Sequence, residues 1–512
     1  MTILNSSVGA LRLSLAKGET LIVRNYSGVE TVTGSTVSRE DASSTLGAGA
    51  VVYGPQSVAA SIVLSTSGTL DYQTVMGDPT PAVNALVELS GGSPVGIITP
   101  DGRPVGGGGA VLVGADKVRL MLSAIRTGGW QRVNLAYHGH SIIAGACSDD
   151  SAGFNYASAQ VWRQRSVAAM LSHALNGVVG GVWSGGFESM VNPQQGRYTL
   201  SGAMFSAQYS LTGPAGFMAS LNTATDTITF TAEGSAVKVY AYASVAGTVL
   251  RYKINGGATQ NAAAAPSTST GHGARVWYPV VISGLTVGDS VQLVGATSGV
   301  IAVYGVDPAH TTAAGITVHR CGNSGGMGAQ TVAAYLDDTD TQPGAGTGWT
   351  AAGSAALRSM QTDSVTTQLE AVGVLNMFDV NDIKAYGDAA NGTAWGWGID
   401  THVRHLQNYL SAMAARSLPV VFTFGPLRDP STASSLTAPF TQADLIDAYK
   451  QVIAASSSAA YIDLTQEFTG ATLAERYAAQ QATGLIYDSV HPNGKGSAYF
   501  GAQRIAQALL SA

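Results

Sequence analysis

Short runs of β-branched and aromatic residues, cut by glycine, serine and asparagine, fill the first part of the chain. LIVRNY, TVTGSTV, AVVYG and SIVLST are such runs, and VGIITPDGRPV contains a DG turn signal. This pattern predicts short strands joined by tight turns, and the four glycines at 106–109 are typical of a hinge. No cluster of cysteine, histidine or carboxylate residues marks this region. We therefore expect residues 1–112 to form a β-rich attachment or assembly module.

Apolar residues recur at helical spacing from Ala115, in ADKVRLMLSAIRTGG, and Gly128 ends this pattern. VNLAY at 133–137 then predicts an apolar strand, and a second helix fits residues 157–175. After residue 316, strands of buried type alternate with helices. The strands are GITVHR, VGVLNMF, LPVVFTF and AAYIDL, and the helices fall at 402–417, 443–457 and 497–512. Such alternation predicts a parallel sheet covered by helices on both faces.

Between these two regions the hydrophobic period changes to the alternation of half-buried strands. TITFTAEG, VKVYAYAS, VLRYKINGG, VWYPVVIS and SVQLVGA follow one another closely, and NGG at 255–257 is a hairpin signal. The stretch is too long for a loop and is the right size for a domain. We therefore expect a β-sandwich at 184–315, inserted into a three-layer α/β domain made of residues 113–183 and 316–512.

Composition excludes several classes of protein. Charged residues make up 11% of the chain, less than half of the roughly 25% usual for soluble domains, and the net charge is −6. Without a cationic cluster, nucleic-acid binding is not expected. No apolar run approaches the ~20 residues that span a bilayer, and the N-terminus lacks the pattern of a secretory signal. Cys147 and Cys321 are too few for a disulfide scaffold; we expect two buried thiols, with a bridge between them as the alternative.

Four separated blocks carry polar residues suited to acyl chemistry, and each lies beside a predicted strand or helix end. They are GHS after VNLAY, GNSGG at 322–326, DVND at 379–382, and DSVHPN at 488–493 before the last helix. In open α/β sheets the active site lies just beyond the carboxyl ends of the strands. The blocks can therefore meet at one edge of the predicted sheet.

This ordered set resembles the SGNH, or GDSL-type, hydrolase family, which is named after a serine, glycine, asparagine and histidine in four such blocks. Ser141 matches the nucleophile, Gly325 the oxyanion glycine and Asn381 the side-chain oxyanion donor. Asp488 and His491 match the D-x-x-H motif of the family. The resemblance covers the two α/β segments. It implies the three-layer fold of the family, an ester hydrolase activity and no cofactor or metal.

The chemistry implied is nucleophilic acyl transfer. A serine hydroxyl is a weak nucleophile until a base takes its proton, and His491 can do this near neutral pH. Asp488 would accept the other imidazole N–H and fix its tautomer. The backbone N–H groups of Ser141 and Gly325 and the amide of Asn381 would stabilise the oxyanion.

The chain departs from the family pattern in three places. Each matched residue also has an alternative interpretation as a residue without a catalytic role. His140 stands where an acidic residue usually precedes the serine, Asp379 stands where a glycine is usual, and Ser141 and Gly325 are unusually far apart. The sandwich accounts for the long separation. The alternatives are a helix N-cap for Ser141, a surface position for His491, a helix-start aspartate for Asp488, a turn for Asn381, and Gly322 or Gly326 in place of Gly325.

Two further groups have open interpretations. His138, His140 and His319 would be the ligands of a metal site, although no cysteine or carboxylate spacing supports one. Trp395 and Trp397 are either an aromatic platform for sugar or ordinary packing residues.

We therefore expect a serine esterase that removes O-acetyl groups from a polysaccharide, such as one on a bacterial surface. The alternatives are a non-catalytic glycan-binding protein on the same scaffold and a general bacterial GDSL esterase or lipase. Low charge, no evident signal peptide and a β-rich N-terminal module favour a phage tail spike or tail fibre. In that setting we expect a trimer in the virion tail, joined to other tail components through the N-terminal module. The alternative is a secreted or cell-surface bacterial esterase.

Overall fold

The structure is a computed structural model of the whole chain. It describes the N-terminal strands given below with residue 35, and then residues 111–145, 147–148, 166–189, 198–202, 204–206, 218–267, 276–322, 369–378, 398–428 and 438–512. None of the helices in these ranges is long and apolar enough to cross a bilayer.

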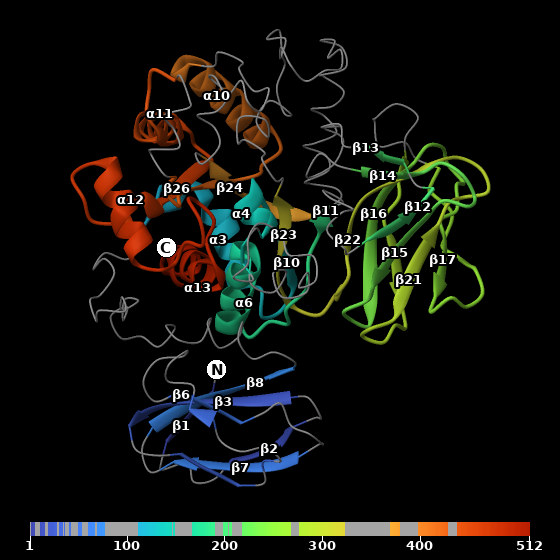
Figure 1. Cartoon of the computed structure of the whole chain (residues 1–512), viewed down its shortest axis with the longest axis horizontal. Helices are drawn as coiled ribbons and strands as arrows, with labels where there is room; N and C mark the ends of the chain where they lie inside the picture. The colour runs from blue at the N-terminus through green and yellow to red at the C-terminus, as the bar shows by residue number, and fades with distance from the viewer. Residues whose placement is uncertain are drawn as a thin grey trace.

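The N-terminal region consists of two antiparallel sheets, which Figure 1 shows as stacked layers. One sheet has the strand order β1-β8-β3-β6-β5 and the other β2-β7-β4. The strands are β1 (Thr2–Asn5), β2 (Leu11–Leu15), β3 (Glu19–Ser27), β4 (Glu30–Thr33), β5 (Glu40–Asp41), β6 (Ala50–Tyr53), β7 (Ala60–Thr66) and β8 (Thr69–Met76). The predicted β-rich character of this region is confirmed.

A parallel sheet forms the centre of the α/β domain, with β10 between β23 and β24. Its order is β23-β10-β24-β25-β26, and every neighbouring pair in this run is parallel. The short strand β9 (Leu112–Val113) adds to β26 in the antiparallel direction. The parallel strands are β10 (Arg132–Gly139), β23 (Gly315–Gly322), β24 (Ala371–Phe378), β25 (Val420–Phe424) and β26 (Ala459–Asp463). The predicted parallel sheet is confirmed.

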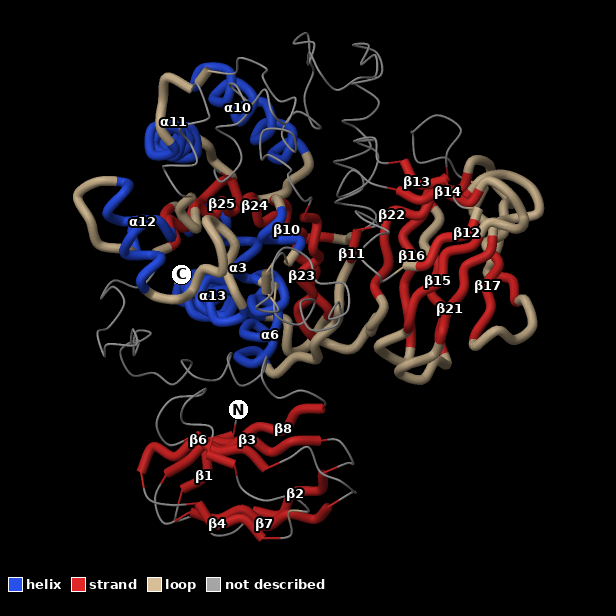
Figure 2. Tube along the Cα trace, viewed as in Figure 1, coloured by secondary structure: helices blue, strands red, loops and turns tan. Residues whose placement is uncertain are grey.

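Helices cover both faces of this sheet and create two separate hydrophobic cores. One core is formed by α3, α6 and the C-terminal helices, and the other by α10 and α11. Figures 1 and 2 show these two groups on opposite sides of the strands. The helices are α3 (Arg119–Arg126), α4 (Ser141–Ala144), α6 (Val167–Val179), α10 (Ile399–Ala415), α11 (Gln442–Ala455), α12 (Leu473–Ala482), α13 (Gly494–Ala498), the π-helical turn η8 (Tyr499–Ile505) and α14 (Ala506–Ser511), with the 3-10 turns η1 (Ala115–Val118) and η7 (Leu464–Glu467).

The inserted β-sandwich has one five-stranded sheet, β12-β15-β21-β17-β18, packed against a second sheet around β16 and β22. The strands are β11 (Glu188–Ser189), β12 (Thr199–Ser201), β13 (Met204–Ser206), β14 (Met218–Leu221), β15 (Thr227–Thr231), β16 (Ala236–Ala243), β17 (Arg251–Ile254), β18 (Gln260–Asn261), β19 (Val276–Trp277), β20 (Val280–Ser283), β21 (Ser290–Val294) and β22 (Ile301–Asp307). The second sheet is continuous with the parallel sheet, because β11 pairs with both β22 and β23.

Aromatic side chains reinforce this continuity. Phe187 and Tyr240 meet edge to face with ring centroids 5.2 Å apart, and both belong to the same core as Phe378 of β24. Gly305 of β22 lies so close to the Phe187 ring and the Glu188 carbonyl that a Cβ there would clash with both. The sandwich is therefore packed into the α/β core and is more than a tethered appendage.

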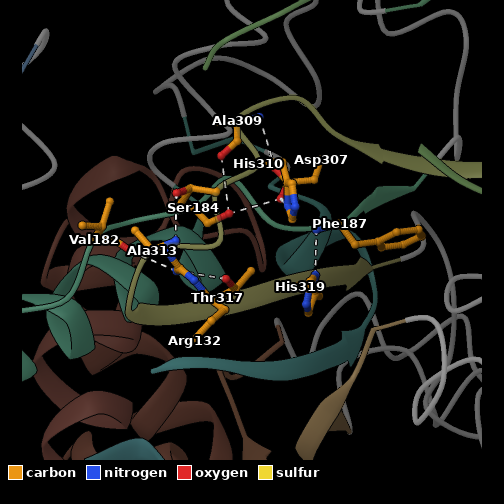
Figure 3. Close-up of polar contacts among 11 residues, drawn as sticks. Arg132, Val182, Ser184, Phe187, Asp307, Ala309, His310, Ala313, Thr317 and His319 are labelled. Atoms are coloured by element: carbon orange, nitrogen blue, oxygen red, sulfur yellow. Dashed lines mark hydrogen bonds and ion pairs between the residues drawn. The ribbon is translucent and has the colours of Figure 1, made fainter. Parts of the chain in front are cut away.

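A polar cluster holds together the chain segments that lead into and out of the sandwich (Figure 3). The buried carboxylate of Asp307, at the end of β22, accepts hydrogen bonds from Ser184 Oγ at 3.1 Å and from the backbone N–H of Ala309 at 3.1 Å. Arg132 of β10 donates to the carbonyl of Val182 and to Thr317 Oγ1. These contacts fix both connections against the first strands of the parallel sheet.

Burial of histidines predicts that acid destabilises this fold. Burial lowers the pKa of His138 and His173 to about 4, and that of His319 and His402 to about 3. In the unfolded chain these histidines have a pKa of about 6.5, so below that pH the unfolded chain binds protons that the native state does not bind. We expect the free energy of unfolding to fall as pH falls from about 6.5 to about 4, by up to about 1.4 kcal/mol per pH unit for each histidine.

Urea unfolding at several pH values measures this slope, and His319→Asn provides the comparison. In the native chain, His319 Nδ1 accepts the backbone N–H of Phe187 at 2.8 Å. An asparagine oxygen can accept the same N–H without titrating. The free energy of unfolding of the variant should therefore depend less steeply on pH, because unfolding of the variant takes up about one proton fewer. Equal slopes for the two proteins would show that His319 does not contribute.

Candidate active site

Ser141 lies just beyond the carboxyl end of β10, where the strand ends at Gly139 and α4 begins. His140 occupies the N-cap position of α4, and its Nδ1 accepts the N–H of Ile142 at 3.5 Å. The N-cap alternative for Ser141 is therefore wrong, and His140 has a local structural role. Gly139 is required by packing, because a Cβ there would lie 2.6 Å from Ile143 Cγ1. Ser141 itself is 8% exposed.

The structure brings together the three residues predicted to form the catalytic chain. Ser141 Oγ lies 2.7 Å from His491 Nε2, although the two residues are 350 positions apart in sequence. His491 Nδ1 lies 2.7 Å from Asp488 Oδ2. The other carboxylate oxygen of Asp488 accepts the backbone N–H groups of Val490 and His491, each at 2.8 Å. This is the geometry in which a base can take the serine proton and an acidic residue can orient the base.

The DSVHPNGKG segment folds into a loop that holds His491 in place. Tyr487 N–H donates to the carbonyl of His491 at 2.8 Å, within an antiparallel bridge between Ile486 and Pro492. Asn493 then caps α13, its Oδ1 accepting the N–H of Gly496 at 2.9 Å. Local hydrogen bonds therefore fix the base independently of Ser141, so that the imidazole is preorganised toward the hydroxyl.

The hydrogen bonds around Asp488 keep it ionised. Partial burial alone would raise the pKa of this carboxyl. The bonds from the side chain and backbone of His491 and from Val490 outweigh burial and hold the pKa well below its usual range. An ionised carboxylate accepts the Nδ1 proton, which leaves the Nε2 lone pair directed at Ser141.

Cys147 contacts the catalytic residues, and the sequence did not predict this contact. Its thiol lies 3.7 Å from Asp488 Oδ2, the same oxygen that faces the imidazole. Cys147 is buried and has a left-handed backbone conformation with φ of 59°. Neither Cys147 nor Cys321 forms a disulfide, so the bridge considered as an alternative is absent. The sequence places Cys147 close to the Ser141 block, but it does not indicate a contact with Asp488, which is 341 positions away.

The predicted oxyanion residues Gly325 and Asn381 lie outside the described residues, as do Asp379, Trp395 and Trp397. Their roles stay predictions. The strands that precede them do flank Ser141: Gly322 of β23 is in register with Gly139, and Asn376 of β24 with His138. Both of these strands therefore end at the sheet edge where Ser141 lies.

The three histidines of the metal alternative do not form a set of converging ligands within the described ranges. His140 caps α4, and His319 Nδ1 is engaged by Phe187. The group that does converge there consists of Cys147, Asp488 and His491.

No family model matches the sequence, and the search of curated proteins gave no match. Among solved structures, a peptidoglycan O-acetylesterase matches with a TM-score of 0.50 and 15% identity, over 78% of this chain and 96% of that chain. A family 2 carbohydrate esterase from Corynascus thermopiles (Myceliophthora fergusii) matches at 13% identity, over 61% of this chain and 98% of that chain. An acetyl xylan esterase from Butyrivibrio proteoclasticus matches at 10% identity, over 64% of this chain and 97% of that chain. The TM-scores of these two, 0.23 and 0.22, are too low to bear on the fold.

The first match shows a shared fold. Its coverage exceeds the two α/β segments, so the likeness also extends into the other strands of this chain. The architecture is therefore an α/β domain with a parallel sheet, an inserted β-sandwich and an N-terminal β region.

Proposed function

We propose that this chain is a serine esterase that removes O-acetyl groups from a polysaccharide. The observation that carries the proposal is the continuous hydrogen-bond series from Ser141 through His491 to Asp488. Each of its two hydrogen bonds has a length of 2.7 Å. The fold shared with a peptidoglycan O-acetylesterase supports the choice of substrate class. The short Ser141–His491 distance favours catalysis over a glycan-binding protein with an inactive site.

In the proposed reaction, Ser141 Oγ attacks the acetyl carbonyl while its proton passes to His491 Nε2. Asp488 stabilises the resulting imidazolium. Ser141 is the first residue of α4, so its backbone N–H has no partner within the helix and can face the oxyanion. Gly325 and Asn381 are the further donors that we propose. The imidazolium then protonates the departing sugar oxygen, and water releases acetate from acetyl-Ser141 by the same route in reverse.

We further propose that the β-sandwich binds or positions the glycan beside the esterase and that the protein works in a phage tail. The low fraction of charged residues, 11%, and the N-terminal β sheets support this setting. The proposed assembly is a trimer joined to other tail components through residues 1–112. Size-exclusion chromatography with light scattering on the full chain separates a trimer from a monomer.

Acetate release tests the proposed function. The full chain is incubated with O-acetylated peptidoglycan, acetylated xylan and p-nitrophenyl acetate, with Ser141→Ala as the background. We expect acetate from at least one polysaccharide and none above background from the variant. Hydrolysis of p-nitrophenyl esters alone would indicate a general esterase. Equal acetate from wild type and variant on all substrates would refute the proposal.

A further inference from the structure

Three unlike metal-binding atoms converge on the side of the imidazole that faces away from Ser141. They are Cys147 Sγ, a carboxylate oxygen of Asp488 and a ring nitrogen of His491, and all lie within 4.8 Å of one another. Cys147 Sγ lies 3.7 Å from Asp488 Oδ2, and that oxygen lies 2.7 Å from His491 Nδ1. Ester hydrolysis uses the carboxylate and the imidazole but has no need of a thiol.

We propose that Cys147, Asp488 and His491 form a binding site for a thiophilic divalent cation, Zn²⁺, and that the bound ion switches the serine off. Sulfur, imidazole nitrogen and carboxylate oxygen are the three ligand types that Zn²⁺ takes in proteins, with a fourth position open to water. The binding is inferred from these three described side chains and does not depend on the proposed function. Its consequence for catalysis rests on the proposed function.

Two of the three pairwise distances lie near those of a tetrahedral ion. Zn²⁺ takes sulfur at about 2.3 Å and oxygen or nitrogen at about 2.0–2.2 Å, so neighbouring ligands in a tetrahedron are about 3.3–3.6 Å apart. The sulfur–oxygen pair already has nearly this separation. The oxygen–nitrogen pair must open by roughly 0.6 Å. The side chains of Asp488 and His491 are 39% and 21% exposed, so they have room to move and the ion has access from solvent.

Binding would invert the proton arrangement on which catalysis depends. The thiol of Cys147 loses its proton to solvent as the sulfur–zinc bond forms. The Nδ1 proton also leaves to solvent, and the neutral imidazole takes up one proton at Nε2. His491 then donates toward Ser141 Oγ and has no lone pair there to accept the serine proton. The carboxylate of Asp488 is meanwhile occupied by the ion.

The donor set also predicts which ions act. Mg²⁺ and Ca²⁺ prefer oxygen ligands, so a site with one thiolate, one imidazole and one carboxylate should discriminate strongly against them. Co²⁺ should occupy the site and show thiolate-to-metal absorption, which reports sulfur ligation directly.

Titration calorimetry with Zn²⁺ on the full chain tests the site, using wild type, Ser141→Ala, Cys147→Ala and Cys321→Ala. Cys321 is the matched control, because it is the other buried thiol and has a backbone carbonyl as its hydrogen-bond acceptor. We expect one tight site per chain in wild type, Ser141→Ala and Cys321→Ala. In Cys147→Ala the affinity should fall at least tenfold. Should the alanine variant fail to fold, loss of the Co²⁺–thiolate band in Cys147→Ser takes its place.

Inhibition provides the second readout, with each protein normalised to its own metal-free rate. Zn²⁺ should inhibit wild type and Cys321→Ala reversibly, with recovery on adding EDTA, and should inhibit Cys147→Ala only at much higher concentration. Wild-type affinity in Cys147→Ala, or no tight binding in wild type, overturns the proposal. Tight binding by Ser141→Ala together with an inactive wild type would leave the metal site standing and refute the esterase function.

Discussion

Replacing Ser141 by alanine is expected to lower kcat for p-nitrophenyl acetate by about 10⁴-fold or more, with little change in KM. The hydroxyl at 2.7 Å from His491 Nε2 is the protein group that forms the covalent bond to the acyl carbon in the proposed reaction. Without it, water must attack directly, and only the oxyanion donors and binding still contribute. Initial rates at several substrate concentrations measure the change.

A double variant sharpens this test. His491→Ala alone should cost about as much as Ser141→Ala, and the double variant should cost no more than either, because the two residues act as one unit. Losses that simply add would contradict the assigned roles and indicate two independent structural effects. Ser148→Ala is a matched control, since Ser148 is a nearby buried serine whose hydroxyl donates to the carbonyl of Gly145, at 2.7 Å. This variant should keep activity within a few-fold of wild type.

Sequence patterns predicted the sheet well because its strands are buried on both faces. VNLAY and LPVVFTF are apolar except for Asn134 and Thr423, and they correspond to β10 (Arg132–Gly139) and β25 (Val420–Phe424). The helices expected at 402–417 and 443–457 correspond to α10 (Ile399–Ala415) and α11 (Gln442–Ala455). Periodicity fails where tertiary packing decides the local geometry. The single helix expected at 497–512 contains the π-helical turn η8, in which Gly501 lies against the backbone of α6.

The candidate site shows the same division. The D-x-x-H spacing identified Asp488 and His491 because one short loop carries both residues and their hydrogen bonds. The contact of Cys147 with Asp488 spans 341 positions and leaves no mark on local sequence. The link through β11 is equally invisible, since a two-residue strand has no periodicity to detect. Motif spacing therefore predicts the groups within one loop, and only the fold shows what surrounds them.

Asp488→Asn is the more informative change at the acidic residue, and we expect it to lower kcat by about 10²–10⁴-fold. Two backbone N–H groups, from Val490 and His491, point at one oxygen of Asp488. They will hold the amide oxygen of asparagine in that place and turn its NH₂ group toward His491 Nδ1. The imidazole must then accept at Nδ1 and carry its proton on Nε2, where it cannot take the proton of Ser141.

Asp488→Ala separates this tautomer effect from a simple loss of charge. Alanine offers no donor to Nδ1, and the position is half-exposed, so that water can accept the Nδ1 proton and preserve the active tautomer in part of the molecules. Alanine should therefore be less damaging than asparagine, even though it removes more hydrogen bonds from the loop. The two kcat values, measured beside unfolding curves for both variants, decide the point. If the Asp488→Asn variant is as active as wild type, or clearly more active than the Asp488→Ala variant, Asp488 does not set the tautomer of His491.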